Sequence, residues 1–292
     1  MQILVANNHL EQCGGTENYT YALIAELKRL GHSVEYFTFK KGFVSEKIEK
    51  ELVVPFMSHS KYNLILANHN TCVTTLHDRG FAVQTCHGVF PKLEQPSSLA
   101  NAHVGISNEV IIHLKEVGVK NPKLILNGID CERFNPKKPL HDRLTSVLSL
   151  CQSDSANTFI EDCCKELGVS FECLNKLGND WRWNVEDYIN DVDLVVGIGR
   201  SAYDAFACGR CVISFDARSY CGKHGDGYIT RNNIDSSLKF NISGRATNKT
   251  FDKRDFINEL MKYNANDGEF LREFAVKNLN IRTKVLHYLS YI

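Results

Sequence analysis

The sequence lacks both a long hydrophobic run and a surplus of charge of either sign. Its 34 Lys and Arg residues balance 34 Asp and Glu residues, so the formal net charge is zero. A chain of this balance has no global field that would attract nucleic acid or an anionic membrane, although a local basic patch still could. No stretch reaches the roughly 18 apolar residues of a transmembrane helix. The first residues enter a strand pattern directly, without the segments of a secretory signal, and we expect a cytoplasmic protein.

The cysteines do not form the pattern of a disulfide framework or of a metal site. Eleven are present, an odd number, and they are scattered along the chain. Cys151 and Cys173 lie inside apolar strand patterns, which suits reduced and partly buried thiols. Cys208 and Cys211 form a single CxxC pair without a second pair or a nearby histidine cluster. We therefore expect no bound metal, with a metal or redox role for this pair as the minor alternative.

The first half of the chain alternates short apolar runs with helical periodicity. Helical patterns cover residues 17–30, 44–52 and 108–117. Such alternation is typical of a parallel, doubly wound sheet with crossover helices. The apolar runs that predict strands are QILVA, SVEYFTF, LILA, AVQTC, AHVGIS and KLILN.

The segment NGIDCERFNPKKPLHDR interrupts this rhythm with two prolines and a cluster of charges, which is typical of a linker. After it the alternation resumes, and from about residue 253 the pattern is helical. We therefore predict an α/β protein of two Rossmann-like doubly wound domains facing a cleft, with residues 1–136 in the first and residues 137–275 in the second. Open α/β folds bind ligands at the carboxyl ends of their strands. The later predicted strands are SVLSLC, SFECL, VDLVVGIG and CVISFD, with helices at 156–167, 184–190 and 201–208.

Two adjacent glycines follow the first predicted strand. Gly14 and Gly15 precede a helix, and without side chains they let backbone N–H groups approach a ligand at the positive end of that helix. This arrangement suits an anionic ligand. The alternative is an ordinary glycine turn between a strand and a helix.

Several segments, taken in order, resemble the family 4 retaining glycosyltransferases. GGTENYTYALIAELKRLGHSVEYFT resembles the opening of that family, CHGVFP its His-Gly loop, and LILNGIDCERFNP its Asn-Gly-Ile-Asp segment. GISNEVIIHLKEVGV and VDLVVGIGRSAYDAFACGRCVISFD resemble its serine-containing strand and helix and its donor-site block. Each match is modest alone, but together they run from residue 3 to residue 216 in the family's order.

The resemblance implies the two-domain fold called GT-B and a hexosyl- or pentosyltransferase that retains configuration without a metal ion or other cofactor. The donor would be a nucleotide sugar such as a UDP- or GDP-sugar, bound mostly by the second domain. An arginine and glycine-loop amides can stabilise a departing diphosphate. The implied donor-binding residues are Gly14, Gly15, Asn127, Gly199, Arg200, Ser201 and Asp204, with Asp204 on the ribose hydroxyls. Residues 276–292 would form a helix that packs back on the first domain.

The resemblance also implies a set of catalytic and acceptor-binding residues. His87 would line the cleft near the transferred sugar and act with Arg200 and Asp204 in catalysis. Glu17 and Asn18 would bind the acceptor. Outside the resemblance, a histidine after a strand more often makes a structural hydrogen bond, and Glu17 could simply favour the helix dipole.

Two departures from the family leave the donor undetermined. Val196 stands where the family has the first glutamate of its Glu-x7-Glu motif. The first predicted helix of the second domain offers only Lys165 in place of the usual Arg and Lys. An inactive binding protein that retains the fold is therefore an alternative.

A nicotinamide-dependent oxidoreductase is a second alternative. Gly197, Gly199 and Ala202 form a Gly-x-Gly-x-x-Ala pattern, and Asp216 closes the next predicted strand. The intervening helix has room for only two turns, which is short for a dinucleotide-binding unit of roughly 30 residues.

The acceptor is not determined by the sequence. A glycan, a glycolipid, a small molecule and a modified nucleobase in DNA all remain open. The basic segments FKKGF and NPKKPLHDR are compatible with an anionic acceptor but also with a solvated surface.

Overall fold

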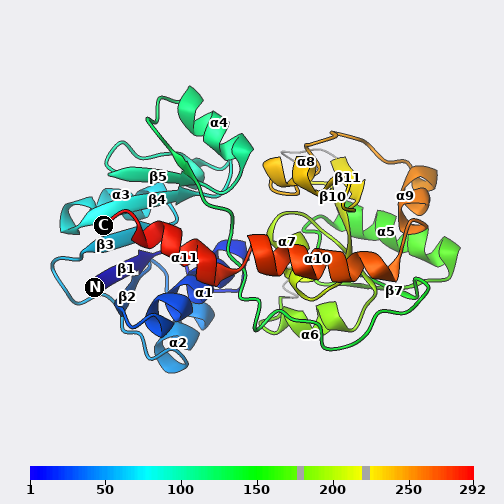
Figure 1. The fold of residues 1–292 in the computed structure, drawn as a ribbon, viewed down its shortest axis with the longest axis horizontal. Helices are drawn as coiled ribbons and strands as arrows, with labels where there is room; N and C mark the ends of the chain where they lie inside the picture. Colours follow the sequence, from blue (N-terminus) through cyan, green and yellow to red (C-terminus); the bar gives the residue numbers. More distant parts are fainter. Residues whose placement is uncertain (176–180, 219–223) are drawn as a thin grey trace. The chain divides into compact units, whose positions relative to one another are not determined.

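The protein consists of two compact units, shown by a computed structural model that describes residues 1–175, 181–218 and 224–292 (Figure 1). Unit 1 comprises Met1–Gly128 and Ile281–Ile292, and unit 2 comprises Ile129–Asn280. The structure thus divides the chain after residues 128 and 280, where the sequence analysis placed the divisions after residues 136 and 275.

Unit 1 contains a six-stranded sheet in the order β2-β1-β3-β4-β5-β6, and every pairing in it is parallel. The predicted α/β class is confirmed. KLILN forms a strand only over its first two residues. The strands are β1 (Gln2–Ala6), β2 (Ser33–Phe37), β3 (Leu64–Ala67), β4 (Phe81–Cys86), β5 (Ala102–Gly105) and β6 (Lys123–Leu124).

The apolar composition of β1 explains its central place in this sheet. Ile3, Leu4 and Val5 are fully buried, and Ile3 lies in register with Val34 of β2 on one side and Leu64 of β3 on the other. A strand covered on both faces favours a continuous apolar run over an alternating one. Polar residues can follow only where the strand ends, at Asn7 and Asn8.

The helices of unit 1 include one that the sequence analysis missed, the short α3 that follows β3. Helix α11, which follows the second division of the chain, packs on α1 within unit 1, where the hydroxyl of Tyr19 donates to that of Tyr288 at 3.0 Å. The helices are α1 (Gly15–Arg29), α2 (Phe43–Lys50), α3 (Asn70–Leu76), α4 (Asn108–Glu116) and α11 (Ile281–Leu289), with 3₁₀ turns η1 (His77–Arg79) and η2 (Lys92–Glu94).

Unit 2 contains a five-stranded sheet in the order β11-β10-β9-β7-β8. Four of its strands are parallel, but β11 pairs antiparallel with β10 and was not predicted, because HGDGY has no apolar pattern. The strands are β7 (Ser146–Ser149), β8 (Ser170–Cys173), β9 (Leu194–Val196), β10 (Cys211–Asp216) and β11 (His224–Tyr228). The helices are α5 (Asp154–Leu167), α6 (Val185–Asn190), α7 (Arg200–Ala207), α8 (Ile234–Lys239), α9 (Lys253–Leu260) and α10 (Ala265–Asn278).

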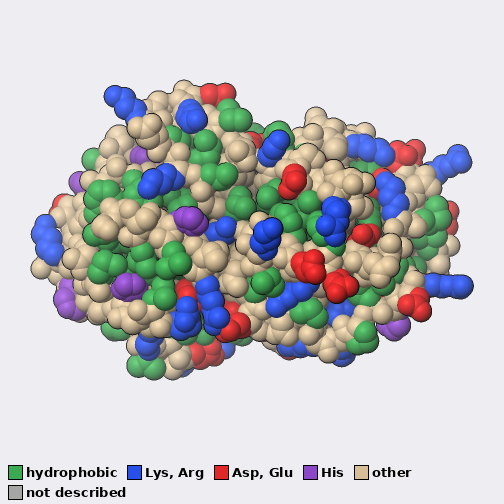
Figure 2. All heavy atoms as spheres, in the orientation of Figure 1, with side chains coloured by type: hydrophobic (Ala, Val, Ile, Leu, Met, Phe, Trp, Pro, Cys, Tyr) green, Lys and Arg blue, Asp and Glu red, His purple; other side chains and the backbone are tan. Residues whose placement is uncertain are grey.

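The surface is mixed in charge, in keeping with the zero net charge. On the face shown in Figure 2, basic and acidic side chains are interspersed. None of the helices in the described part of the chain combines the length and the apolar character needed to cross a bilayer.

Candidate functional site

A glycine turn joins β9 to α7 in unit 2. Gly199 immediately precedes the helix with φ 56° and ψ −124°, a conformation that side-chain-bearing residues rarely adopt. A β-carbon at this position would lie 3.2 Å from Nδ2 of Asn241. The glycine therefore permits both the backbone turn and the close approach of Asn241. It directs the first N–H groups of α7 to the carboxyl end of the sheet, where a helix terminus favours an anion.

Arg200 and Asp204 form a buried ion pair on the first turns of α7. The Nε of Arg200 lies 3.0 Å from Oδ1 of Asp204, and their side chains are 10% and 6% exposed. Burial raises the pKa of Asp204, and the Arg200 and Arg133 guanidinium groups oppose that rise. Asp204 thus fixes the guanidinium at the helix start, beside the predicted Ser201.

Buried polar atoms without hydrogen-bond partners lie on α7 and on the loop that packs against Gly199. Within the described residues, these atoms are Oη of Tyr203, Oδ1 of Asn241 and Oγ of Ser243. Asn241 and the next residue, Ile242, both have positive φ, at 57° and 48°. Buried polar atoms are normally satisfied, so these three atoms retain unused hydrogen-bonding capacity.

The linker segment is fastened to unit 2 by an arginine that the sequence analysis did not single out. Arg133 donates to both carboxylate oxygens of Glu186, at 3.0 and 2.9 Å, and its guanidinium lies 4.4 Å from the ring centre of Trp183. A two-pronged arginine–carboxylate pair fixes geometry as well as charge. Asp130 forms a turn by accepting the N–H groups of Glu132 and Arg133.

The two departures from the family pattern have visible structural consequences. Val196 is fully buried at the end of β9 and packs in the core of unit 2, so its side chain cannot replace a sugar-binding glutamate. Lys165 lies in the last turn of α5 and pairs with Glu161 at 2.9 Å. Neither position supplies the group that the family uses.

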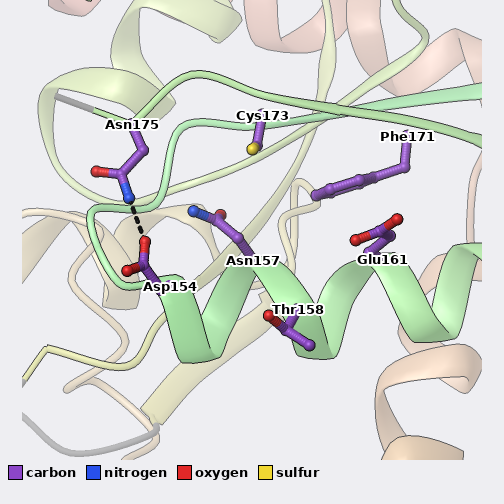
Figure 3. Close-up of a pocket in the computed structure, with 7 residues that line it drawn as sticks. All are labelled: Asp154, Asn157, Thr158, Glu161, Phe171, Cys173 and Asn175. Carbon is purple, nitrogen blue, oxygen red and sulfur yellow. Dashed lines mark hydrogen bonds between the residues drawn. The ribbon is translucent and has the colours of Figure 1, made fainter. Parts of the chain in front are cut away.

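A shallow hollow of about 350 Å³ lies between α5 and the edge strand β8 (Figure 3). Its carboxylates are already partnered, because Asp154 accepts from Nδ2 of Asn175 at 2.7 Å and Glu161 binds Lys165. The helix that carries basic residues in the family thus presents acidic ones here, which does not suit a diphosphate. The hollow is lined by Asp154, Asn157, Thr158, Glu161, Phe171, Cys173 and Asn175.

In unit 1 a hydrogen-bonded network connects the carboxyl ends of β1, β3 and β4 to α1. Asn7 and Asn68 each donate an Nδ2 hydrogen to Oγ1 of Thr20 at 2.9 Å. His87 follows β4, and its Nε2 donates to Oδ1 of Asn68 at 3.1 Å. The ring of His87 also meets that of Tyr19 edge to face. His87 is therefore held by two neighbouring elements.

Two buried carboxylates flank this network. Glu17, in the first turn of α1, is 4% exposed and has Oε1 3.8 Å from Nε2 of His9. Glu94, in η2, is 8% exposed, accepts the backbone N–H of His87 at 2.6 Å and lies 3.8 Å from Nε2 of His69. The rings of His9 and His69 stack. We call the polar cluster of unit 1 the set Asn7, His9, Glu17, Thr20, Asn68, His69, His87 and Glu94.

The ionisation of this cluster is shifted by burial. Burial raises the pKa of Glu94 to about 7; the His87 N–H opposes the rise and the charge of Glu17 adds to it. Burial, reinforced by His9, lowers the pKa of His69 to about 4. At neutral pH His69 is therefore uncharged, and Glu94 is partly protonated.

The predicted site residues fall into separate groups. Gly199, Arg200, Ser201 and Asp204 meet at the start of α7. Gly14, Gly15, Glu17 and Asn18 meet at the start of α1, which the network joins to His87. Gly14 has an extended backbone conformation that any residue can adopt. It is therefore set apart by its lack of a side chain and not by its φ angle. Asn127 lies apart from both groups in the chain, buried, with no partner for Oδ1 within the described residues.

The sequence analysis missed Asn68, His69 and Glu94. Asn68 and His69 follow a predicted strand in the polar run NHN, which was the available signal. Glu94 had no signal, because it reaches the cluster from a loop after β4.

The single CxxC pair of the chain lies in unit 2. Cys208 and Cys211 are both buried, and burial raises the pKa of their thiols to about 12 and about 11. Such thiols are poor nucleophiles and redox groups. No group of three or more potential metal ligands occurs in residues 1–175, 181–218 and 224–292.

No protein-family model matches the chain, and no curated protein matches it. Solved structures do resemble it. A glycosyltransferase from Rickettsia africae ESF-5 is 15% identical with a TM-score of 0.64, covering 99% of this chain and 97% of its own. AviGT4, a glycosyltransferase involved in avilamycin A biosynthesis, is 11% identical with a TM-score of 0.56, covering 99% and 96%.

A third similar structure is an α-glucosyltransferase in complex with UDP and a 13-mer DNA that contains an HMU base. It is 11% identical with a TM-score of 0.51, covering 99% of this chain and 95% of its own. At such identities the similarity establishes the fold. The chain has the mixed α/β fold of two sheets that these GT-B proteins share.

Proposed function

We propose that the protein is a glycosyltransferase that moves a hexosyl or pentosyl group from a nucleotide sugar to an acceptor hydroxyl, with retention of configuration. The proposal assigns the donor, such as a UDP- or GDP-sugar, to unit 2 and the acceptor to unit 1. The fold shared with glycosyltransferases supports it. So do the polar residues at the carboxyl ends of both sheets, where open α/β proteins bind ligands.

The observation that carries the proposal is the glycine turn at the start of α7. Gly199 presents the first N–H groups of the helix, and Arg200 is held beside them by Asp204. Backbone amides and a fixed guanidinium are the donors that stabilise a diphosphate leaving group. These groups can bear the charge of that step themselves, and the proposal therefore requires no metal ion.

In the proposed reaction the acceptor oxygen forms a bond to the anomeric carbon as the bond from that carbon to the diphosphate oxygen breaks. The acceptor proton passes to the departing diphosphate on the same face of the sugar. Gly14, Gly15 and Arg200 would contact the diphosphate and Asp204 the ribose. His87 would donate to a hydroxyl of the transferred sugar, while Glu17 and Asn18 would hold the acceptor.

Thermal stabilisation by nucleotides and nucleotide sugars tests the donor assignment, because a ligand that binds only the native state raises the melting temperature. We expect a shift with one nucleoside diphosphate and its sugars, and a loss of that shift in Arg200→Ala. Lys165→Ala, at a solvent-exposed ion pair of the same unit, is the matched control and should keep the shift.

Product analysis then tests transfer. The responding donor is incubated with a glycan, a glycolipid, small polyols and DNA that carries a hydroxymethylated base, and the anomer of any product is assigned by NMR. An inverted product would contradict retention. Donor binding without any transfer or hydrolysis would favour the inactive binding protein. Binding of NAD or NADP alone would favour the oxidoreductase, although Asp216 is engaged by Arg218 at 2.8 Å.

A further inference from the structure

Glu94 lies near the ends of three strands of unit 1 and binds one of them directly. Oε2 accepts the backbone N–H of His87 at 2.6 Å, directly after β4. Oε1 faces Nε2 of His69, which follows β3, at 3.8 Å. The Nδ1 of His69 accepts the backbone N–H of Asn8, after β1, at 3.2 Å. A neutral His69 therefore carries its proton on Nε2, which faces Glu94 at 3.8 Å without a hydrogen bond.

Protonation of Glu94 would weaken this arrangement. An ionised carboxylate accepts the His87 N–H as a charge-assisted hydrogen bond at 2.6 Å, whereas Oε1 lies too far from Nε2 of His69 for a hydrogen bond. A proton on Oε2 would take the place of the His87 N–H, and a proton on Oε1 would leave Oε2 as a weaker, uncharged acceptor. Because His69 has a pKa of about 4, its ring does not take up this proton near neutral pH.

The charged and titratable groups around Glu94 do not include a strong cationic partner on its own turn, where Lys92 is exposed. Glu17 from α1 adds a like charge that raises the pKa of Glu94, and the Cys86 thiol of β4 is close enough to feel that carboxylate. His9 lies behind His69 through ring stacking. With these neighbours, the carboxylate depends on the His87 N–H for its stabilisation.

We propose that Glu94 is a positioning residue for His87: its ionised carboxylate holds the His87 backbone through the hydrogen bond to the His87 N–H, and protonation loosens that hold. The inference rests on the proposed function, which places His87 beside the transferred sugar. The position of His87 would then depend on pH. The transfer rate should then fall about tenfold for each pH unit below the pKa of Glu94. The raised pKa of about 7 puts this change close to neutrality.

The direct test needs no substrate. The carboxyl carbon of Glu94, the His87 amide and the His87 ring carbon are followed by NMR through a pH titration of the wild type and of Glu94→Gln. We expect the Glu94 carbon and the His87 amide to titrate together near pH 7, apart from the ring. Glu94→Gln retains an oxygen acceptor for the His87 N–H and should abolish that amide step.

Glu35→Gln is the matched control. Glu35 is another buried carboxylate of unit 1, 3% exposed on β2, and it is held by Ser58, His59 and Tyr62 rather than by the cluster. Its substitution should leave the His87 titration unchanged. A Glu94 carbon that titrates at its ordinary pKa, or a His87 amide step that survives Glu94→Gln, would overturn the proposal.

A pH profile of transfer provides the functional readout. Wild type and Glu35→Gln should lose activity on the acid side near the pKa of Glu94, whereas Glu94→Gln should be flat there. An acid limb that persists in Glu94→Gln would also overturn the proposal. A failure of the proposed function itself would appear differently, as the absence of transfer in every variant with the NMR titration intact.

Discussion

The carboxyl ends of the two sheets carry different kinds of polar groups. In unit 1 the cluster consists of carboxylates, imidazoles, amides and a hydroxyl. In unit 2 the start of α7 offers backbone N–H groups and the guanidinium of Arg200. The same α/β plan thus presents carboxylates with mixed donors and acceptors in one unit, and backbone and cationic donors in the other. This difference suits unit 1 to hydroxyl groups and unit 2 to phosphates.

The buried carboxylates of the two sites differ in the same way. Asp204 pairs with a guanidinium at 3.0 Å, so its charge is cancelled within the helix. Glu94 relies on a backbone N–H, and burial raises its pKa to about 7. Two arginines oppose the rise in pKa that burial causes at Asp204, whereas the charge of Glu17 adds to the rise at Glu94.

We expect the largest effect, a loss of turnover, from Arg200→Ala. Removing a preorganised charge that stabilises a leaving group typically lowers turnover by about 10²–10³-fold. The substitution should act on the chemical step and on donor binding, with acceptor KM unchanged. Steady-state kinetics with both substrates varied would measure this.

Asp204→Asn is the companion variant, because Arg200→Ala alone leaves Asp204 buried without its ion partner. If Arg200→Ala reduces only the yield of folded protein, the double variant should recover folding but not turnover. A double variant with wild-type turnover would contradict the role of Arg200.

Gly199→Ala should destabilise unit 2 by about 2 kcal/mol, because alanine is strained at this positive φ and its β-carbon would approach Asn241. Gly168→Ala is the matched control in the same unit, since Gly168 has φ 68° with nothing within 4 Å of the added carbon. It should cost about 1 kcal/mol. Denaturant unfolding would measure the loss of unfolding free energy in both variants. Equal losses would mean that Asn241 moves away from the added β-carbon without a free-energy penalty.

The substitutions Glu35→Gln in unit 1 and Asp193→Asn in unit 2 allow the pH dependence of stability to be compared between the units. Burial alone would raise the pKa of each carboxyl, but hydrogen bonds outweigh it and lower both to about 2, from Tyr62 and Ser58 on Glu35 and from Thr145 and His141 on Asp193. A depressed carboxyl pKa contributes stability above the unfolded value that disappears as pH falls toward the folded value.

We therefore expect each substitution to cost about 2 kcal/mol at neutral pH. The cost should disappear between about pH 4 and about pH 2, where the wild-type groups become protonated. Unfolding followed by residue-resolved hydrogen exchange would assign each loss to its unit. A loss that is independent of pH would contradict the assignment of these carboxyls.

The smallest effect is expected from Tyr288→Phe, which removes the hydroxyl contacts to Tyr19 and Thr85, both at 3.0 Å. The loss should be about 1 kcal/mol and confined to unit 1. Tyr228→Phe removes a comparable contact to Asp267 in unit 2, at 3.1 Å. Hydrogen exchange of α11 and α10 would distinguish the effects of the two substitutions. If either substitution lowered protection in both units, the independence of the units would be contradicted.

The sequence predicted most of the fold because the central strands of each sheet are continuous apolar runs. LILA and CVISFD became β3 and β10 as expected. The missed elements lack such a signal: α3 contains four β-branched residues in NTCVTTL, and β11 contains two glycines. Tertiary packing decides the conformation of such segments, and sequence periodicity does not report it.

The sequence brings together only those candidate-site residues that are adjacent in the chain. The α7 group, Gly199 to Asp204, which the family resemblance supplied, lies within one short segment. The contacts of His87 with Asn68 and Glu94 depend on the order of strands in the sheet. The sequence also did not show that the carboxylates of α5 beside the hollow are paired with other side chains. Such pairing depends on the folded structure.

The most direct test of the division between the units is an NMR titration of backbone amides with UDP and, separately, GDP. The account predicts that one nucleotide shifts the amides of Gly199, Arg200 and Ser201 strongly and those of Gly14 and Gly15 less, while Glu35 on β2 stays unchanged. Shifts confined to unit 1, or the absence of any shift at the start of α7 with either nucleotide, would contradict a donor site in unit 2.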